Sequence, residues 1–355
     1  PPQDGAPAAV IGGAAVQVQT VGLAEAAAAG TDRWGQLTAA ATGAATAAWQ
    51  TCLAGLSVQA AARLHGLQQH PRVQVHRLWY GDCWLRDTAP LWGHDVTGGV
   101  AARCFAFNGW GQKFAIAGDA GLAGRIAAAA QLPWTASTMV LEGGGIDVDG
   151  EGRMLVSACL VDACHNPAMD KAAFEAALWT LGDALVVLWL EGALAGDHTD
   201  GHVDTLARFI APGVAVCMQA PAGHVNAAVL QGVQATLRAG GAGGGRPLRV
   251  CTLPAPDPIE DRAGRMLPAS YCNFYFGHSA VFVPQYGVPQ DSAALACLAA
   301  LLPTHPVVGV PALAILRGGG ALHCITQQQP KACPAARVAA VRADRQDANA
   351  DSVEA

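Results

Sequence analysis

Hydrophobic and polar positions recur along this chain in one repeated order. A strand pattern at residues 73–80 precedes a pair of alternating segments at 91–107, which turn at 97–99, and an amphipathic helix near 118–131 follows. Glycine-containing turns between alternating segments are typical of hairpins, whereas apolar spacing of three and four residues is typical of helices. The order hairpin, helix, strand therefore defines one structural unit.

Three more units follow in the same order. Their hairpins turn at 149–150, 211–213 and 277–278 and occupy residues 146–161, 202–219 and 272–284. Their helices and closing strands fall at 168–181 with 185–190, at 224–238 with 248–253, and at 292–302 with 307–310. Helical spacing also recurs over residues 34–69, so the pattern predicts five α/β units. The recurrence of one unit along the chain is typical of repeats and propellers.

The two ends of the chain lack this pattern. Residues 1–30 are low in complexity, and residues 336–355 form a polar, alanine-rich tail. Such segments tend to be disordered, although the tail could also form a short surface helix. We therefore expect one domain over residues 31–335 with an atypical first unit.

Composition narrows the class of protein. The 355 residues are 52% apolar and 14% charged with a net charge of −6, so nothing attracts nucleic acid or anionic lipid. No apolar run approaches the roughly 20 residues of a membrane-spanning helix, which predicts a soluble, cytoplasmic protein. Because the chain begins with Pro, organellar targeting by a removed leader stays an alternative. The 11 cysteines, without a CxxC pair, are typical of reduced thiols.

Polar side chains gather in four stretches where strands of successive units end. These stretches are GDCWLRDTAP with Trp84 and Asp87, LEGGGIDVDGEG with Glu142, GDHTDGHVDTLARF with Asp200, His202 and Asp204, and RGGGALHCITQQQP with Gly319 and Cys324. On an extended strand, His202 and Asp204 would point to the same side. The four stretches supply a thiol, an imidazole and carboxylates for one central site.

These residue types favour a cationic ligand. A cysteine needs a base or a positive charge to become a thiolate, and His202 is the candidate base. Carboxylates near Cys324 would raise the pKa of the thiol, unless the substrate itself carries positive charge. A guanidinium ligand would suit this arrangement, because its planar fork donates hydrogen bonds to Asp87 and Asp204 and its charge stabilises the thiolate.

Structural alternatives exist for each residue. Asp87 could pair with Arg86, Glu142 could cap a turn, and His323 is expected to be a packed strand residue that points away from Cys324. His198 and His202, with Cys159, Cys164 and His165 elsewhere, could indicate zinc. Gly201 and Val203 disfavour the helix on which such a spacing binds metal best, so we expect no metal and no other cofactor.

Six motifs in this order resemble those of agmatine deiminases, in the peptidylarginine deiminase-like branch of the guanidino-group-modifying enzymes. They are WLRDTAP, FNGWGQKF, LEGGGIDVDGEG, GDHTDGHVDTLARF, ASYCNFYFGHSAVFVPQYG and GGGALHCITQQQP, and they cover about residues 73–330. The resemblance implies the five-bladed α/β propeller of the pentein fold and a homodimer.

The resemblance also implies residue roles. Cys324 would be the nucleophile, His202 the general acid and base, Asp87 and Asp204 the clamp on the guanidinium, and Glu142 a further acid. We expect the substrate-binding residues to be Asp87, Asp204, Trp84, Asp200 and Gly319. The implied reaction is hydrolysis of agmatine to N-carbamoylputrescine and ammonia through a covalent thiouronium intermediate, as in polyamine biosynthesis.

Two departures from the family leave alternatives open. Residues before 73 lack the family's opening segment, and His198 stands where the family commonly has an acid. Loss of an acid near a dicationic substrate would weaken the binding of agmatine. The motifs therefore support the deimination reaction more strongly than they support agmatine as the substrate. The chain could instead deiminate peptidyl or free arginine, or bind agmatine without turning it over.

Overall fold

Four three-stranded mixed sheets form the frame of the protein in this computed structural model, which describes residues 16–17, 73–76, 78–95, 97–179, 186–240 and 248–334. In each sheet the first two strands are antiparallel and the third is parallel to the second. A helix joins the second strand to the third. A parallel pair needs such a crossover because its strands run in the same direction.

The bounds of the four units follow the predicted order. The first has β3 (Leu91–His94), β4 (Val100–Ala106), α5 (Leu122–Ala129) and β5 (Trp134–Val140). The second has β6 (Ile146–Val148), β7 (Arg153–Ser157), α6 (Lys171–Trp179) and β8 (Val186–Leu190). The third has β9 (Ala207–Ala211), β10 (Val214–Gln219), α8 (Ala227–Gly240) and β11 (Arg249–Pro254). The fourth has β14 (Tyr275–Phe276), β15 (Val281–Gln285), α9 (Gln290–Leu301) and β16 (Val307–Pro311).

Two short antiparallel pairs complete the sheets. They are β1 (Val16–Gln17) with β2 (Gln74–Val75), and β12 (Ile259–Glu260) with β13 (Met266–Leu267). The strand expected at residues 73–80 is thus two residues long. The helical pattern at 34–69, the tail at 336–355 and nearly all of residues 1–30 lie outside the described residues. Within the described part, no helix is long and apolar enough to cross a membrane.

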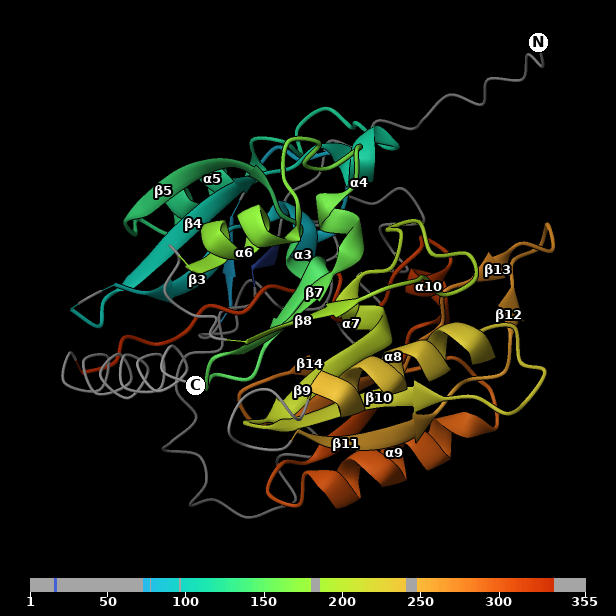
Figure 1. Ribbon diagram of the computed structural model, residues 1–355. Coiled ribbons are helices and arrows are strands. Elements are labelled where there is room, and N and C mark those ends of the chain that lie inside the picture. The colour runs from blue at the N-terminus through green and yellow to red at the C-terminus, as the bar shows by residue number, and fades with distance from the viewer. Residues whose placement is uncertain are drawn as a thin grey trace, which may run out of the picture.

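The middle strand of each sheet has more buried side chains than either of its neighbours. All residues of β7 are buried, and four of the six in β10 are. On α8 the buried Leu230, Val233 and Leu237 recur every three or four residues, so they form one apolar stripe. This stripe packs on β8 and β10 and thereby joins two successive units, as α9 does between β11 and β16. In Figure 1 α9 lies on the outside of the molecule, beyond β11.

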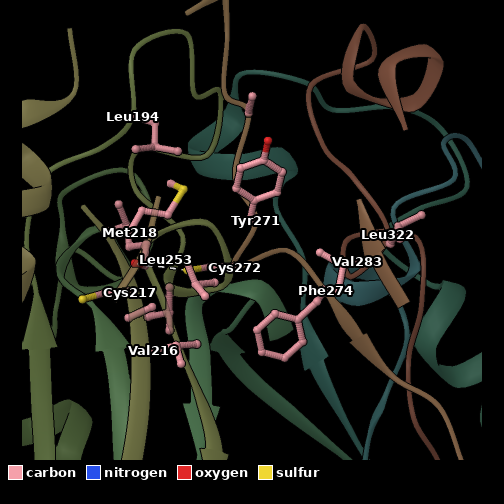
Figure 2. Close-up of a cluster of buried hydrophobic side chains, with 14 of the residues drawn as sticks. Leu194, Val216, Cys217, Met218, Leu253, Tyr271, Cys272, Phe274, Val283 and Leu322 are labelled. Carbon is pink, nitrogen blue, oxygen red and sulfur yellow. Dashed lines mark hydrogen bonds between the residues drawn. The ribbon is translucent and has the colours of Figure 1, made fainter. Parts of the chain in front are cut away.

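The main core lies between the third and fourth units. Tyr271, Cys272 and Phe274 precede β14 and are fully buried. Figure 2 shows them between Met218 and Val216 of β10 on one side and Val283 and Leu322 on the other. This core fixes the segment that enters the fourth unit.

Short helical turns stand at the entrance of successive units. The turn α3 (Leu85–Thr88) precedes β3, the 3-10 turn Gly143–Gly145 precedes β6, and α7 (Val203–Leu206) precedes β9. The last short turn, α10 (Leu313–Leu316), follows β16 and leads into the Cys324 segment. The polar stretches singled out in the sequence coincide with these turns.

The C-terminal part of the described chain closes against the first unit. The Arg86 backbone N donates to the Cys324 carbonyl at 2.9 Å, and the Arg86 guanidinium donates to Gln328 Oε1 at 2.7 Å. Further along, Gln327 donates to the Pro90 carbonyl, and Cys333 N donates to Gly98 O. These bonds bring Cys324 beside α3, although 237 residues separate Arg86 from His323 in the sequence.

Truncation of the α8 stripe tests the packing between units. We expect Leu237→Ala to lower the free energy of unfolding by about 2–5 kcal/mol, because a fully buried side chain leaves a cavity. The exposed neighbour Gln231→Ala serves as the control and should change it by less than about 0.5 kcal/mol. Chemical denaturation measures both, and equal effects would contradict this packing.

Candidate active site

Asp87 is held in place by two donors from other segments. It lies on α3 and is buried, with Trp110 Nε1 donating to Oδ2 at 2.9 Å and Gly144 N donating to Oδ1 at 2.9 Å. His202 Nδ1 approaches the same Oδ1 at 3.7 Å. Three units therefore meet at one carboxylate.

Glu142 binds the other nitrogen of the same imidazole. Its Oε2 lies 2.9 Å from His202 Nε2, and both side chains are buried. Glu142 precedes the three-glycine turn and makes no capping hydrogen bond with its side chain. The turn-cap alternative for Glu142 is therefore wrong, because the carboxylate reaches His202 instead.

Cys324 faces Asp204 and Asn273. Its Sγ lies 3.6 Å from Asp204 Oδ2 and accepts a hydrogen bond from Asn273 Nδ2 at 3.1 Å. Asp204 Oδ2 also lies 2.7 Å from His323 Nδ1. The other oxygen, Oδ1, is buried without a hydrogen-bond partner among the described residues. An unpaired buried acceptor is costly, and here it belongs to the carboxylate whose other oxygen faces the thiol.

Gly144 and Gly320 bring these groups into one space. A methyl group on Gly144 would lie 2.6 Å from His202 Nδ1, 2.8 Å from Asp87 Oδ1 and 3.3 Å from Asp204 Oδ2. A methyl group on Gly320 would lie 3.1 Å from Cys324 Sγ and 2.6 Å from the Trp84 ring. Only glycine fits at these two positions without displacement of its neighbours.

Burial and charge together set the protonation states of the ligand-free site. Burial raises the pKa of Cys324 well above its usual value, and the charges of Asp204 and Asp87 raise it further, so Cys324 is a thiol. Burial alone would lower the pKa of His202, but Asp87 and Glu142 raise it to about 10. Burial raises the pKa of Asp204 to about 6 against the opposing charge of His202. The site thus holds a thiol and an imidazolium at neutral pH.

Two further predicted residues, Trp84 and Gly319, lie at the rim of this cluster. The Trp84 ring packs beneath the glycines before Cys324, and its Nε1 donates to Asp82 Oδ2 at 3.0 Å. A methyl group on Gly319 would meet the exposed His198 ring at 3.0 Å. Direct contact of Trp84 and Gly319 with substrate stays a prediction.

Asp200 does not join the buried carboxylates. Its side chain is half exposed, and its Oδ2 pairs with Lys113 Nζ at 2.6 Å. Asp200 has a positive φ of 63° and is followed by Gly201, whose φ is 102°. The structure therefore places Asp200 in the outer layer, opposite Lys113.

The local backbone corrects two expectations about the histidines. His202 is the N-cap of α7, with Asp204 in its first turn, so the extended strand expected there is wrong even though both side chains face the site. His323 lies in the turn 322–325 rather than in a strand. Both His323 Nδ1 and Cys324 Sγ therefore approach the same oxygen of Asp204, and the expected opposite directions are wrong.

Arg86 and Asp87 do not form the ion pair that was the structural alternative for Asp87. Arg86 donates to Gln328 and to the His323 carbonyl, whereas Asp87 accepts from Trp110 and Gly144. Adjacent residues on a helical turn point in different directions, so sequence proximity did not produce the pair.

Sequence reasoning missed three residues that organise the site. They are Trp110, which holds Asp87, Asn273, which holds Cys324, and His165, which lies 3.4 Å from Glu142. Trp110 and Asn273 were within the quoted motifs FNGWGQKF and ASYCNFYFGHSAVFVPQYG, which was the available signal. Residues 109–112 all have positive φ, and such strain is concentrated at functional sites.

The metal alternative finds no support in the described residues. Among them, no group of three or more His, Cys, Asp and Glu side chains is arranged to hold a metal ion. His202 is bound to Glu142, and His198 packs against Phe114 with ring centroids 5.8 Å apart. None of the ten cysteines in the described residues forms a disulfide.

Comparison with known proteins assigns the family. Residues 29–330 match the model of the Porphyromonas-type peptidyl-arginine deiminase family. The chain belongs to this family. The match begins at residue 29, so it extends further toward the N-terminus than the six motifs do. This family match confirms the resemblance drawn from the motifs.

Similar proteins and solved structures carry the name agmatine deiminase, in agreement with the family match. The chain is 34% identical over 290 residues to agmatine deiminase of Stutzerimonas stutzeri, covering 73% of this chain and 77% of the relative. Agmatine deiminase of Enterococcus faecalis superposes with a TM-score of 0.69 at 30% identity, covering 76% of this chain and 81% of that one. A cysteine-to-serine variant of C. jejuni agmatine deiminase with substrate bound superposes with a TM-score of 0.70 at 29% identity, covering 77% of this chain and 80% of that one. The fold is thus the α/β propeller of the penteins, as predicted.

Gly144→Ala tests how tightly the site of this family member is packed. We expect it to lower the free energy of unfolding by about 1–3 kcal/mol, because the new methyl group overlaps His202 and Asp87. Gly93→Ala is the matched control, since its methyl group meets no atom within 4 Å, and it should be neutral or slightly stabilising. Thermal unfolding measures both, and a neutral Gly144→Ala would contradict the close approach.

Proposed function

We propose that the protein hydrolyses a guanidinium group through Cys324, and that agmatine is its substrate, with N-carbamoylputrescine and ammonia as products. One observation carries this proposal: a buried thiol lies 3.6 Å from Oδ2 of Asp204, and the other oxygen of that carboxylate, Oδ1, has no hydrogen-bond partner among the described residues. A guanidinium offers both the positive charge and the planar donors that such an arrangement lacks.

The charges of the site favour a cation over a neutral ligand. Asp87, Glu142 and Asp204 are all buried, and His202 is the shared cationic partner of Asp87 and Glu142. A bound guanidinium would favour ionisation of Asp87 and Asp204. It would also lower the pKa of Cys324, so the thiol would lose its proton to solvent when substrate is present.

In the first half-reaction, the Cys324 thiolate attacks the guanidinium carbon and forms a C–S bond. The His202 imidazolium donates its Nδ1 proton to the departing nitrogen, and the C–N bond breaks to release ammonia. The carbon then carries a cationic thiouronium group on Cys324. Glu142 keeps the imidazole oriented toward the carbon throughout.

In the second half-reaction, neutral His202 removes a proton from water, and the resulting hydroxide attacks the same carbon. The C–S bond breaks, which returns Cys324 as thiolate and releases the ureido product. The proton of the hydroxyl group that was added to the carbon passes to the released ammonia and gives ammonium, so charges and atoms balance. Asn273 donates to the sulfur at 3.1 Å and would stabilise the departing thiolate.

Agmatine is the substrate we favour because of the relatives. Those from Stutzerimonas stutzeri and Enterococcus faecalis are agmatine deiminases by name. A second candidate substrate is arginine, free or at a peptide end, and the outer layer favours it. Asp200 is neutralised by Lys113, and His198 stands over Gly319, so a substrate with a carboxylate would meet less repulsion there. The kcat/KM values for agmatine, arginine and an arginine peptide decide between these substrates.

Removal of the thiol tests the proposed chemistry. We expect Cys324→Ala to lose ammonia release from agmatine by at least about 10³-fold, because alanine has no sulfur with which to form the C–S bond. Cys164→Ala, at an exposed free thiol, is the control and should keep wild-type activity. Unchanged turnover by Cys324→Ala would overturn the mechanism, whereas agmatine binding without turnover by the wild type would identify an inactive binding protein.

The raised pKa of Asp204 predicts how binding depends on pH. The carboxylate form is lost as the pH falls through about 6, so the Kd of the Cys324→Ala variant for agmatine should rise about tenfold for each pH unit below 6. Isothermal titration calorimetry from pH 4.5 to 8 measures this. Asp204→Asn in the same background should bind weakly at every pH, and a flat profile without this substitution would refute the role of Asp204.

A further inference from the structure

His165 is a buried titratable residue that the mechanism above leaves unused. It lies between the 3-10 turn Ala158–Val161 and α6 and is 3% exposed. Its Nε2 lies 3.4 Å from Glu142 Oε2, and the same oxygen lies 2.9 Å from His202 Nε2. One carboxylate oxygen thus lies between two imidazoles.

Asp162 holds His165 in this position. The Asp162 Oδ1 atom lies 2.9 Å from His165 Nδ1 and accepts from the backbone N atoms of Cys164 and His165 at 2.8 Å each. On the other side, a methyl group on Gly111 would lie 3.1 Å from His165 Cε1. The ring is therefore fixed between its own loop and the loop that carries Trp110.

The contacts of both ring nitrogens favour the imidazolium form. Each nitrogen faces a carboxylate, so the two negative charges favour a positively charged His165. Burial lowers the pKa of His165, but Glu142 and Asp162 together raise it above its usual value. The contact with Glu142 is long and poorly aligned, so charge rather than a hydrogen bond couples the two residues.

A charged His165 competes with His202 for the same negative charge. Burial alone would raise the pKa of Glu142, yet its two imidazole partners lower it to about 2, so Glu142 keeps one negative charge at all relevant pH values. If His165 were neutral, that charge would hold the His202 proton more firmly, because one repelling cation would be gone. Proton donation to the leaving nitrogen would then be slower.

We propose that His165 is a positioning residue that shares the Glu142 carboxylate with His202 and thereby eases the release of the His202 proton. This inference concerns the same site and rests on the proposed deiminase function. The charged and titratable groups that surround His165 are Glu142 and His202 across the site, Asp162, Cys159 and Cys164 on its own side, and Arg103 of β4.

A cavity next to His165 gives room for a variant that keeps the charge. It has a volume of about 470 Å³, and its lining includes Arg103, Asn166 and Met169 besides His165. In the described part of the chain, Cys324 and His202 do not line it. The longer side chain of an arginine at position 165 therefore has room for its methylene groups in this space while its guanidinium pairs with Glu142.

The test compares the pKa of His202 in ligand-free wild type, His165→Gln and His165→Arg by NMR with histidine labelled at Cε1. We expect His165→Gln to raise the pKa of His202 by on the order of one unit, whereas His165→Arg leaves it near the wild-type value. The kcat of His165→Gln should fall about threefold to tenfold with little change in KM, because proton donation is impaired. His94→Gln, at an exposed histidine, is the control.

An unchanged or lowered pKa of His202 in His165→Gln would overturn the proposal. If that variant does not fold, the wild type decides, since the His202 resonance should show a second inflection at the midpoint of the His165 titration. Absence of this inflection would equally overturn it. Both pKa measurements need no turnover, so a wild-type protein without deiminase activity would refute the proposed function and leave this test intact.

Discussion

The burial of three carboxylates in the site that also holds a thiol is the constraint on which the rest of this structure depends. Asp87, Glu142 and Asp204 are removed from water, and a buried charge is costly unless partners are supplied. Trp110, Gly144, His202 and His165 supply partners for Asp87 and Glu142, and His323 supplies one for Asp204. Asp204 Oδ1 stays unpaired among the described residues, and that remaining position suits a cation.

The fold meets this constraint by repetition. Each described unit begins with a short segment that delivers one part of the site, namely Asp87 before β3, Glu142 before β6, Asp204 before β9 and Asn273 before β14. The Cys324 segment then closes on α3 through Arg86. Because every sheet has the same strand order, the same position in each unit points toward a shared centre, and residues far apart in the sequence meet there.

The sequence revealed the units and the residue types but not the local backbone of the site. Turn glycines and strand alternation predicted all four described hairpins, because these signals act over a few residues. His202 and Asp204 were paired for the wrong reason: α7 depends on contacts with β6 and β7 that no local pattern contains. Trp110 and His165 could not be assigned in advance, since their partners Asp87 and Glu142 lie 23 residues away in sequence for each pair. A role for His323 was discounted because alternation was assumed in what is a turn.

Capture of the covalent intermediate tests the central claim most directly. Wild-type protein is mixed briefly with agmatine, quenched in acid, digested and examined by mass spectrometry. The account predicts that the peptide with Cys324 gains the mass of agmatine less ammonia, and that the same peptide of Asp204→Asn gains little. Ammonia release by the wild type without any adduct on Cys324 in the pre-steady-state period, or with an adduct on another cysteine, would contradict it.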